Sequence, residues 1–200
     1  MPSINNSLQD FSRHIENHIQ ESISAVSLVR SELIKDIYTA ANIIIDTFKS
    51  GHKILIAGNG GSAADAQHIA AEFTIRLNAE IERPSLPAVA LSTDTSALTA
   101  AGNDFGFNHI FKRQLEGLAQ PGDCFMAIST SGNSQNLIDA LQIAREKNIR
   151  TIALLGKDGG VMKELAEVPI IVRANNTMHV QEAHICIYHL ICDLVERSMY

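Results

Sequence analysis

The sequence predicts a doubly wound α/β fold, in which helices cover both faces of a parallel sheet of five strands. From residue 53 onward, short apolar runs alternate with segments of helical periodicity. The short runs are apolar throughout, as in parallel strands that are covered on both faces. The chain has 200 residues, and a chain of that length buries roughly 70% of its unfolded surface, so one domain with a sizeable core is expected.

Five strands and five helices are expected in this part of the chain. The strands cover residues 53–57, 88–91, 124–128, 151–155 and 170–172. The helices cover residues 62–73, about 108–118, 134–147, about 161–166 and 177–198. No linker, low-complexity tract or repeat interrupts the series. Residues 51–200 are therefore expected to form the core of a single domain, a flavodoxin-like α/β/α sandwich.

Residues 7–50 are expected to form an N-terminal helical extension. Two apolar stripes recur there at helical spacing: Leu8, Phe11, Ile15, Ile19, Ile23 and Val26, then Leu33, Ile37, Ala41, Ile44 and Phe48. Such helices either pack on their own domain or form a bundle with copies of the chain. The run Ile43-Ile44-Ile45 broadens the apolar face and favours the bundle, and hence an oligomer.

Composition argues against some classes of partner and indicates the compartment of the protein. A net charge of −6 without a Lys/Arg cluster argues against a nucleic-acid partner. Cys124 and Cys186 lie in apolar runs and none of the three cysteines is in a CxxC arrangement, so buried free thiols are expected. The start MPSINNSLQDF has no signal-peptide pattern, and no apolar run approaches the ~18 residues of a membrane span. A cytoplasmic protein without a membrane partner is expected.

The first strand leads into a glycine loop that predicts an anion site. Gly58-Asn59-Gly60-Gly61 permits positive φ angles and close approach of a ligand. Ser62 and Asp65 have the spacing of a capping box, so a helix is expected to open at Ser62. The positive end of that helix favours phosphate. His68 and Glu72, four residues apart, are expected on one face of the same helix.

Polar loops follow the other strands at the same edge of the sheet. The loop Ser129-Thr130-Ser131-Gly132-Asn133-Ser134 places four hydroxyls before a helix, a phosphate receptor that needs no lysine. The segments 93–96 and 102–104 add polar groups suited to sugar hydroxyls. Ligands of such sheets bind at the carboxyl ends of the strands. The chain is therefore predicted to bind a phosphorylated polyol.

Five motifs occur in order: GNGGSAADAQH, GNDFG, ISTSGNS, GKDGG and QEAHICIYH. Together they resemble the sugar isomerase (SIS) domain family and, within it, the phosphoheptose isomerases, over nearly the whole chain. The resemblance implies conversion of sedoheptulose 7-phosphate to D-glycero-D-manno-heptose 7-phosphate, the first step toward bacterial heptose in lipopolysaccharide. It also implies a homotetramer with active sites at subunit contacts and one Zn²⁺ per subunit.

The resemblance assigns roles to individual residues. Glu72 would be the catalytic base and His189 the acid. The metal ligands would be His68, Glu72, Gln181 and His189. The substrate would be bound by Asn59, Gly60, Gly61, Ser62, Glu72, Asn103, Asp104 and Gln181, with its phosphate held by Ser129, Thr130, Ser131 and Ser134.

The chemistry of the residues agrees with these roles. Aldose–ketose interconversion moves a proton between adjacent carbons through an ene-diol, which requires a base and a group that manages the oxygens. Gln181 and His189 are eight residues apart, about 12 Å along a continuous helix. Either Gln181 lies at or before the start of that helix, or His189 comes from another subunit.

Other interpretations remain open at this point. Gly58–Ala63 fits a loose dinucleotide fingerprint, but the expected second strand ends without the acidic residue of that motif. His68 and Glu72 could form an ordinary surface pair, and His184 is expected to be packed or exposed without a role. Within the same superfamily, a tetrameric scaffold that binds the bacterial replication initiator is the main alternative, and its resemblance includes Glu82–Leu91. A sugar-phosphate sensor is a further alternative.

Overall fold

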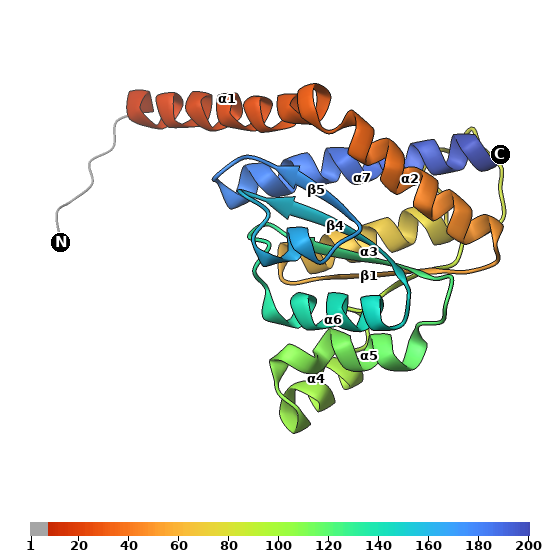
Figure 1. Ribbon diagram of the computed structural model, residues 1–200. Helices are drawn as coiled ribbons and strands as arrows, with labels where there is room; N and C mark the ends of the chain where they lie inside the picture. The colour runs from red at the N-terminus through yellow and green to blue at the C-terminus, as the bar shows by residue number, and fades with distance from the viewer. Residues whose placement is uncertain (1–7) are drawn as a thin grey trace.

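The structure, a computed structural model, describes residues 8–200 and contains one parallel sheet between two layers of helices (Figure 1). The strands are β1 (Ile54–Gly58), β2 (Ala88–Ala90), β3 (Cys124–Ser129), β4 (Arg150–Gly156) and β5 (Val168–Val172). The helices are α1 (Leu8–Glu32), α2 (Ile34–Lys49), α3 (Gly61–Thr74), α4 (Thr95–Asp104), α5 (Ile110–Leu118), α6 (Gln135–Glu146) and α7 (Thr177–Met199), with 3₁₀ turns η1 (Phe107–His109) and η2 (Val161–Glu164). The sequence predicts no signal peptide at its start. Residues 1–7, most of the segment on which that prediction rests, lie outside the described part.

The sheet has the strand order β2-β1-β3-β4-β5, and every pair of neighbours is parallel. This is the flavodoxin-like order of a doubly wound sheet, so the predicted fold class is confirmed. All five predicted strands are present, and their ends lie within two residues of the expected positions. β3 and β4 are buried along almost their whole length, which explains why their sequences are apolar without alternation.

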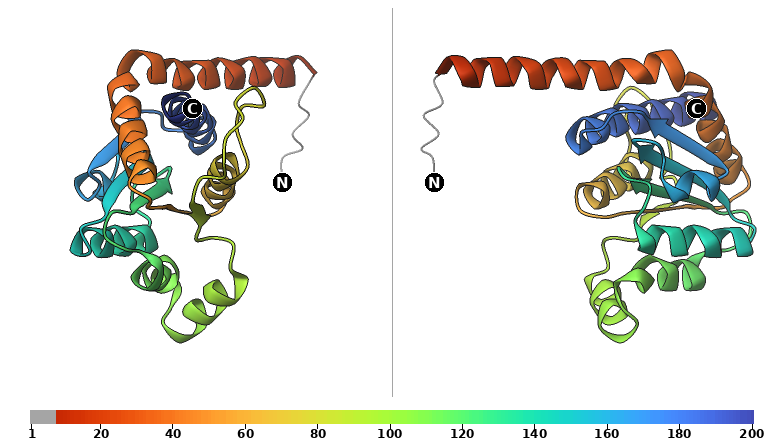
Figure 2. Two further views of the ribbon diagram at one scale, coloured as in Figure 1. Left: turned by 90° about the vertical axis from the view of Figure 1, so that its right-hand side faces the viewer. Right: turned by 60° about the vertical axis from the view of Figure 1, so that its left-hand side comes forward.

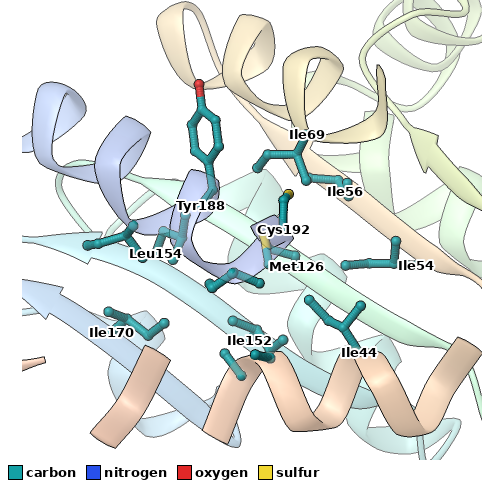
Figure 3. Close-up of a cluster of buried hydrophobic side chains, with 14 of the residues drawn as sticks. Ile44, Ile54, Ile56, Ile69, Met126, Ile152, Leu154, Ile170, Tyr188 and Cys192 are labelled. Carbon is teal, nitrogen blue, oxygen red and sulfur yellow. The ribbon is translucent and has the colours of Figure 1, made fainter. Parts of the chain in front are cut away.

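Successive residues of each strand point to opposite faces of the sheet and fill two separate cores. On one face, Ile56 and Met126 pack with α2, α3 and α7 (Figure 3). On the other face, Leu55 and Phe125 pack with α5 and α6. Figure 1 shows the same division, with α3 and α7 above the sheet and α5 and α6 below it.

One helix was not predicted. Residues 95–104, expected to contribute polar loops, form α4. The signal is Asp94, which precedes the helix and accepts a hydrogen bond from the amide of Ala97 at 2.9 Å. An aspartate in this position is a typical N-cap. The segment expected to be helical around residues 161–166 is only the 3₁₀ turn η2.

The N-terminal segment forms two helices with different environments. Ile43, Ile44 and Ile45 are all buried in the core of their own domain, so the reason given for a bundle is wrong for α2. The α1 stripe, by contrast, is uncovered in the single chain, since Phe11, Ile15 and their neighbours Leu8, Ile19 and Ile23 are each more than half exposed. The first turns of α1 extend past the rest of the molecule (Figure 2).

Cysteine burial is as predicted for Cys124, which lies in β3 with no exposed surface. Cys192 is buried too, but Cys186 is only partly buried, because it lies on the side of α7 that borders a groove against α1 and α2. All three are free thiols.

Within residues 8–200, no helix has both the length and the apolar character needed to cross a membrane.

Candidate functional site

The site lies where the chain changes from one face of the sheet to the other. β1 and β3 are neighbours, and Gly58 pairs with Ile128 near their carboxyl ends. α3 follows β1 onto one face, and α6 follows β3 onto the opposite face. The two loops therefore diverge at the carboxyl edge of the sheet, where ligands bind in doubly wound folds.

The loop after β1 turns at Gly60, which precedes α3 with φ at +56°. No side chain caps this helix, and Ser62 is a buried residue inside its first turn, so the predicted capping box is wrong. The amides of Ser62 and Ala63 instead donate to the carbonyl oxygens of Asn59 and Gly60, each at 3.0 Å. The positive φ at residue 60 explains why this turn favours glycine there.

Gln181 of α7 lies directly against this loop. A Cβ atom at Gly61 would approach the Gln181 Oε1 atom to 2.6 Å, so a side chain at residue 61 would displace the Gln181 amide from this position. The Gln181 Nε2 atom donates to Asp65 Oδ2 at 3.1 Å. Burial of Asp65 raises the pKa of its carboxyl group, although the bond from Gln181 opposes that shift. Gln181 therefore joins α7 to the first turns of α3.

The side chain of Asn59 pairs with Asn136, a buried residue at the start of α6. Two hydrogen bonds of 2.9 and 2.8 Å join their amide groups. The pair ties the loop after β1 to the helix that follows β3. Asn59, expected to bind substrate, thus uses its side-chain amide to set the distance between the two loops.

The loop after β3 gathers three hydroxyl groups. The Oγ atom of Ser129 lies 3.4 Å from Ser131 Oγ and 3.0 Å from Ser134 Oγ, immediately before α6. The amide of Gly132 donates to Ser129 Oγ at 3.1 Å. Hydroxyls that converge at a helix N-terminus form a suitable phosphate receptor. Thr130 lies in the same loop and is partly buried.

The GKDGG turn supports this loop from behind. A Cβ atom at Gly132, whose φ is +66°, would lie 2.1 Å from the carbonyl oxygen of Gly159. The amide of Met162 donates to the Gly132 carbonyl oxygen at 3.0 Å, and the amide of Val161 donates to Asn133 Oδ1 at 3.1 Å. These contacts explain the motif without giving a chemical role to Lys157.

His68, Glu72 and His189 form a cluster of donor atoms. The His68 Nε2 atom lies 2.8 Å from Glu72 Oε1. One donor atom from each of the three residues lies within 4.8 Å of the others. His189 reaches this cluster from α7 of the same chain, so it need not come from another subunit. His68 and Glu72, for which an ordinary surface pair was the alternative interpretation, are thus part of a three-residue group.

Tyr188 orients His68. Its ring is buried in the core beside α3, and its oxygen atom points away from that core (Figure 3). The phenol lies 2.9 Å from His68 Nδ1. Burial raises the pKa of the phenol above its usual range, so the group stays protonated. It can donate to Nδ1 when His68 carries its proton on Nε2, or accept from Nδ1 when Nε2 binds a metal.

Gln181 does not join His68, Glu72 and His189 within the chain. It lies inside α7, not before its start, and contacts Asp65 and Gly61. The eight residues between Gln181 and His189 correspond to about 12 Å of helix. The structure thus brings together three of the four residues expected to bind the metal.

The C-terminal end of α3, which carries Glu72, is fixed by a buried ion pair. Arg83 and Glu196 have no exposed side-chain surface, and the Arg83 Nη2 atom lies 2.7 Å from Glu196 Oε1. Arg83 also donates to the carbonyl oxygens of Glu72 at 2.6 Å and Phe73 at 2.8 Å. The segment 82–91, which resembled the scaffold proteins, thus has a structural role beside the site.

Asn103 and Asp104 lie at the C-terminal end of α4 and are exposed. The Nδ2 atom of Asn103 donates to Asp104 Oδ1 at 2.8 Å. A small hollow of about 160 Å³ separates the glycine loop from Leu98 of α4 and Phe107 of η1. α4 therefore forms a wall beside the glycine loop.

His184, expected to be either packed or exposed, is fully buried. Its Nε2 atom donates to the carbonyl oxygen of Leu155 at 3.0 Å. Burial lowers its pKa to about 4, so the imidazole is neutral at physiological pH. It belongs to the core.

Three residues of the site were not predicted. Tyr188, Asn136 and Asp65 act through other side chains, by bonds to His68, Asn59 and Gln181. Tyr188 and Asn136 lie in apolar helical patterns that indicate only packing. Asp65 did carry a signal, but the capping-box spacing gave it a different role.

Comparison with known proteins places this geometry in a family. A family model described as the SIS domain matches residues 17–156. The phosphoheptose isomerase of Citrifermentans bemidjiense is 52% identical over 186 residues, which cover 93% of this chain and 96% of that protein. The enzyme of the same name from Nitratiruptor sp. is 51% identical and covers 92% of this chain and 98% of its own length. The solved structure of the phosphoheptose isomerase of Neisseria gonorrhoeae superimposes with a TM-score of 0.87 at 42% identity, over 94% of this chain and 99% of that one.

Proposed function

The chain belongs to the phosphoheptose isomerases of the SIS domain family, and we propose that it converts sedoheptulose 7-phosphate to D-glycero-D-manno-heptose 7-phosphate. The observation that carries this proposal is the cluster of His68, Glu72 and His189, which brings donor atoms of α3 and α7 together. An aldose–ketose isomerase needs a base next to a group that can exchange protons with oxygen, and the cluster offers both. Nothing in the comparisons supports the initiator-binding scaffold.

Glu72 is the proposed base and His189 the proposed acid. The Glu72 carboxylate would remove the proton from the carbon next to the carbonyl and return it to the adjacent carbon. The imidazole of His189 would move the proton between the two oxygens. Tyr188 and His68 hold Glu72 in place through consecutive hydrogen bonds of 2.9 and 2.8 Å. The carboxylate therefore has a defined direction before substrate binds.

The loop of Ser129, Thr130, Ser131 and Ser134 is the proposed phosphate receptor. Its support is the convergence of three hydroxyls at the N-terminus of α6. Gly60, Gly61 and Ser62, with Asn59 behind them, would line the sugar chain. Asn103 and Asp104 would supply hydroxyl contacts from α4.

The donor set of the cluster fits a zinc ion. Two imidazole nitrogens and a carboxylate oxygen are the ligands of many catalytic zinc sites, which keep a further position open. When bound, Zn²⁺ would act as a Lewis acid toward the substrate oxygens. Gln181, expected as a fourth ligand, contacts Asp65 and Gly61 instead, so His68, Glu72 and His189 make up the proposed donor set.

A homotetramer with sites at subunit contacts is the proposed assembly. The exposed stripe of α1, including Phe11, Ile15 and Ile19, supports association of copies because it has no cover in the single chain. The three free cysteines support a reducing compartment, the cytoplasm.

The test is turnover of sedoheptulose 7-phosphate by the purified protein and by Glu72→Gln. Loss of the base should lower kcat by about 10²–10⁴-fold while the protein still binds the sugar phosphate. Glu146→Gln, which changes an exposed glutamate of α6, is the control. The zinc content of each variant is measured in parallel, to separate loss of the base from loss of a ligand. Turnover retained in a zinc-replete Glu72→Gln would refute the assignment.

A further inference from the structure

A second group of metal-binding side chains lies outside the site described above, between α1 and α7. It consists of His18, His179 and Glu182, and one donor atom from each residue lies within 4.8 Å of the others. The His179 Nδ1 atom is 2.9 Å from Glu182 Oε2, and the His18 Nε2 atom is 3.9 Å from Glu182 Oε1. The two imidazole rings are 4.4 Å apart between centroids. Both nitrogen donors therefore face the same carboxylate.

His179 has the environment of a metal ligand. Its side chain is only 2% exposed, and its second nitrogen, Nε2, lies 3.2 Å from Glu21 Oε2. Metal-binding histidines typically donate the N–H group of the nitrogen that does not bind the metal to a carboxylate, which fixes the tautomer and the orientation of the ring. Glu21 occupies this outer position, which leaves Nδ1 for the ion.

We propose that His18, His179 and Glu182 bind a divalent transition-metal ion that fastens α1 to α7. Two donors at ~2.0 Å from one tetrahedral ion are ~3.3 Å apart, so the observed spacings need only small side-chain movements. Two imidazoles and one carboxylate suit Zn²⁺ and similar ions better than Mg²⁺ or Ca²⁺. The side chains of His18 and Glu182 are both partly exposed, which gives an ion a route to the donors.

This site is separate from the first cluster. His179 and His189 are ten residues apart on α7, which corresponds to about 15 Å along the helix. The ion would bridge α1 and α7. The apolar stripe of α1 is exposed, and α7 carries Gln181 and His189. We expect it to be structural, because its ligands come from two helices and hold them together.

The experiment measures zinc bound per chain in a protein that lacks the first site. His68→Ala/His189→Ala removes two donors of that site. After treatment with a chelator, reloading with Zn²⁺ and removal of excess ion, this variant should retain one zinc per chain. Adding His18→Gln should remove it, whereas adding His14→Gln, an exposed histidine one turn earlier on α1, should not. No bound zinc in the His68→Ala/His189→Ala protein, or equal binding after His18→Gln, would overturn the proposal.

A second measurement uses the otherwise unchanged chain. His18→Gln and Glu182→Gln should each lose one equivalent of zinc and lose part of the increase in Tm that Zn²⁺ produces. Turnover should persist in His18→Gln, because that residue lies outside the proposed catalytic cluster. An unchanged zinc content in both variants would contradict the second site and leave the isomerase assignment unaffected.

Discussion

The side-chain amides of Asn59 and Asn136 exchange two hydrogen bonds, of 2.9 and 2.8 Å, between the loop after β1 and the start of α6. One residue belongs to the glycine loop and the other to the first turn of the helix behind the hydroxyl loop. The pair thus fixes the separation of the two segments proposed to hold the sugar and its phosphate.

Asn136→Ala should weaken both folding and binding. It leaves the partly buried Asn59 amide without its partner, which should lower the free energy of unfolding by about 1–3 kcal/mol. The Kd for the sugar phosphate should rise as well, because the loops lose their common anchor. Denaturant unfolding and calorimetric titration measure the two effects. Asn59→Ala/Asn136→Ala should cost less than the sum of the single changes, and strict additivity would contradict the coupling.

Ser131→Ala/Ser134→Ala should weaken phosphate binding with little loss of stability. Hydrogen bonds to a charged group contribute about 1.5–3 kcal/mol each, so the Kd for sugar phosphate should rise at least about 10-fold. Both side chains are partly exposed, and a loss of stability below about 1 kcal/mol is expected. Ser198→Ala, an exposed serine near the end of α7, is the control. An unchanged Kd would exclude this loop as the phosphate receptor.

Tyr188→Phe should lower the zinc affinity of the first site without disturbing its ligands. The ring still fills the core, but His68 loses the partner of its Nδ1 atom. Loss of such an outer contact typically costs 10–100-fold in metal affinity, and a change of roughly this size is expected in a competition titration with a chelating dye. Tyr38→Phe, which changes an exposed tyrosine of α2, should have no effect. Equal affinities in all three proteins would show that Tyr188 serves packing alone.

The buried His184 should make the protein sensitive to acid. Its pKa falls from 6.5 in the unfolded chain to about 4 in the folded one, so between these values the unfolded state binds more protons. The contribution of His184 to the free energy of unfolding is therefore fully present above pH 6.5. It is lost as the pH falls toward 4, a total change of about 3 kcal/mol. Unfolding of His184→Gln, measured in a chelator, should depend less on pH over this window. Parallel curves for the two proteins would contradict the assignment.

The sheet was predictable because its strands are buried on both faces and their apolar runs have no other simple interpretation. Gly60 and the serines of the second loop were predictable because glycine and hydroxyl clusters at the ends of strands are unusual. α4 was missed because Thr95–Asp104 is polar and contains Gly102, and the N-cap at Asp94 was the only signal. The proposed metal ligands show what the sequence could not predict. Spacing along α7 indicated that Gln181 and His189 are far apart, but only the fold showed which of the two lies beside His68.

Arg83 and Glu196 are separated by more than a hundred positions in the sequence, yet they form one electrostatic unit. Replacement of either residue alone leaves a buried charge without a partner, a change that typically costs 3–5 kcal/mol. Apolar residues at both positions would not restore the contacts, because Glu196 also accepts from the amides of Leu77 and Asn78. Because Arg83 also holds the carbonyl oxygens at the end of α3, loss of Arg83 would remove the support of Glu72 as well.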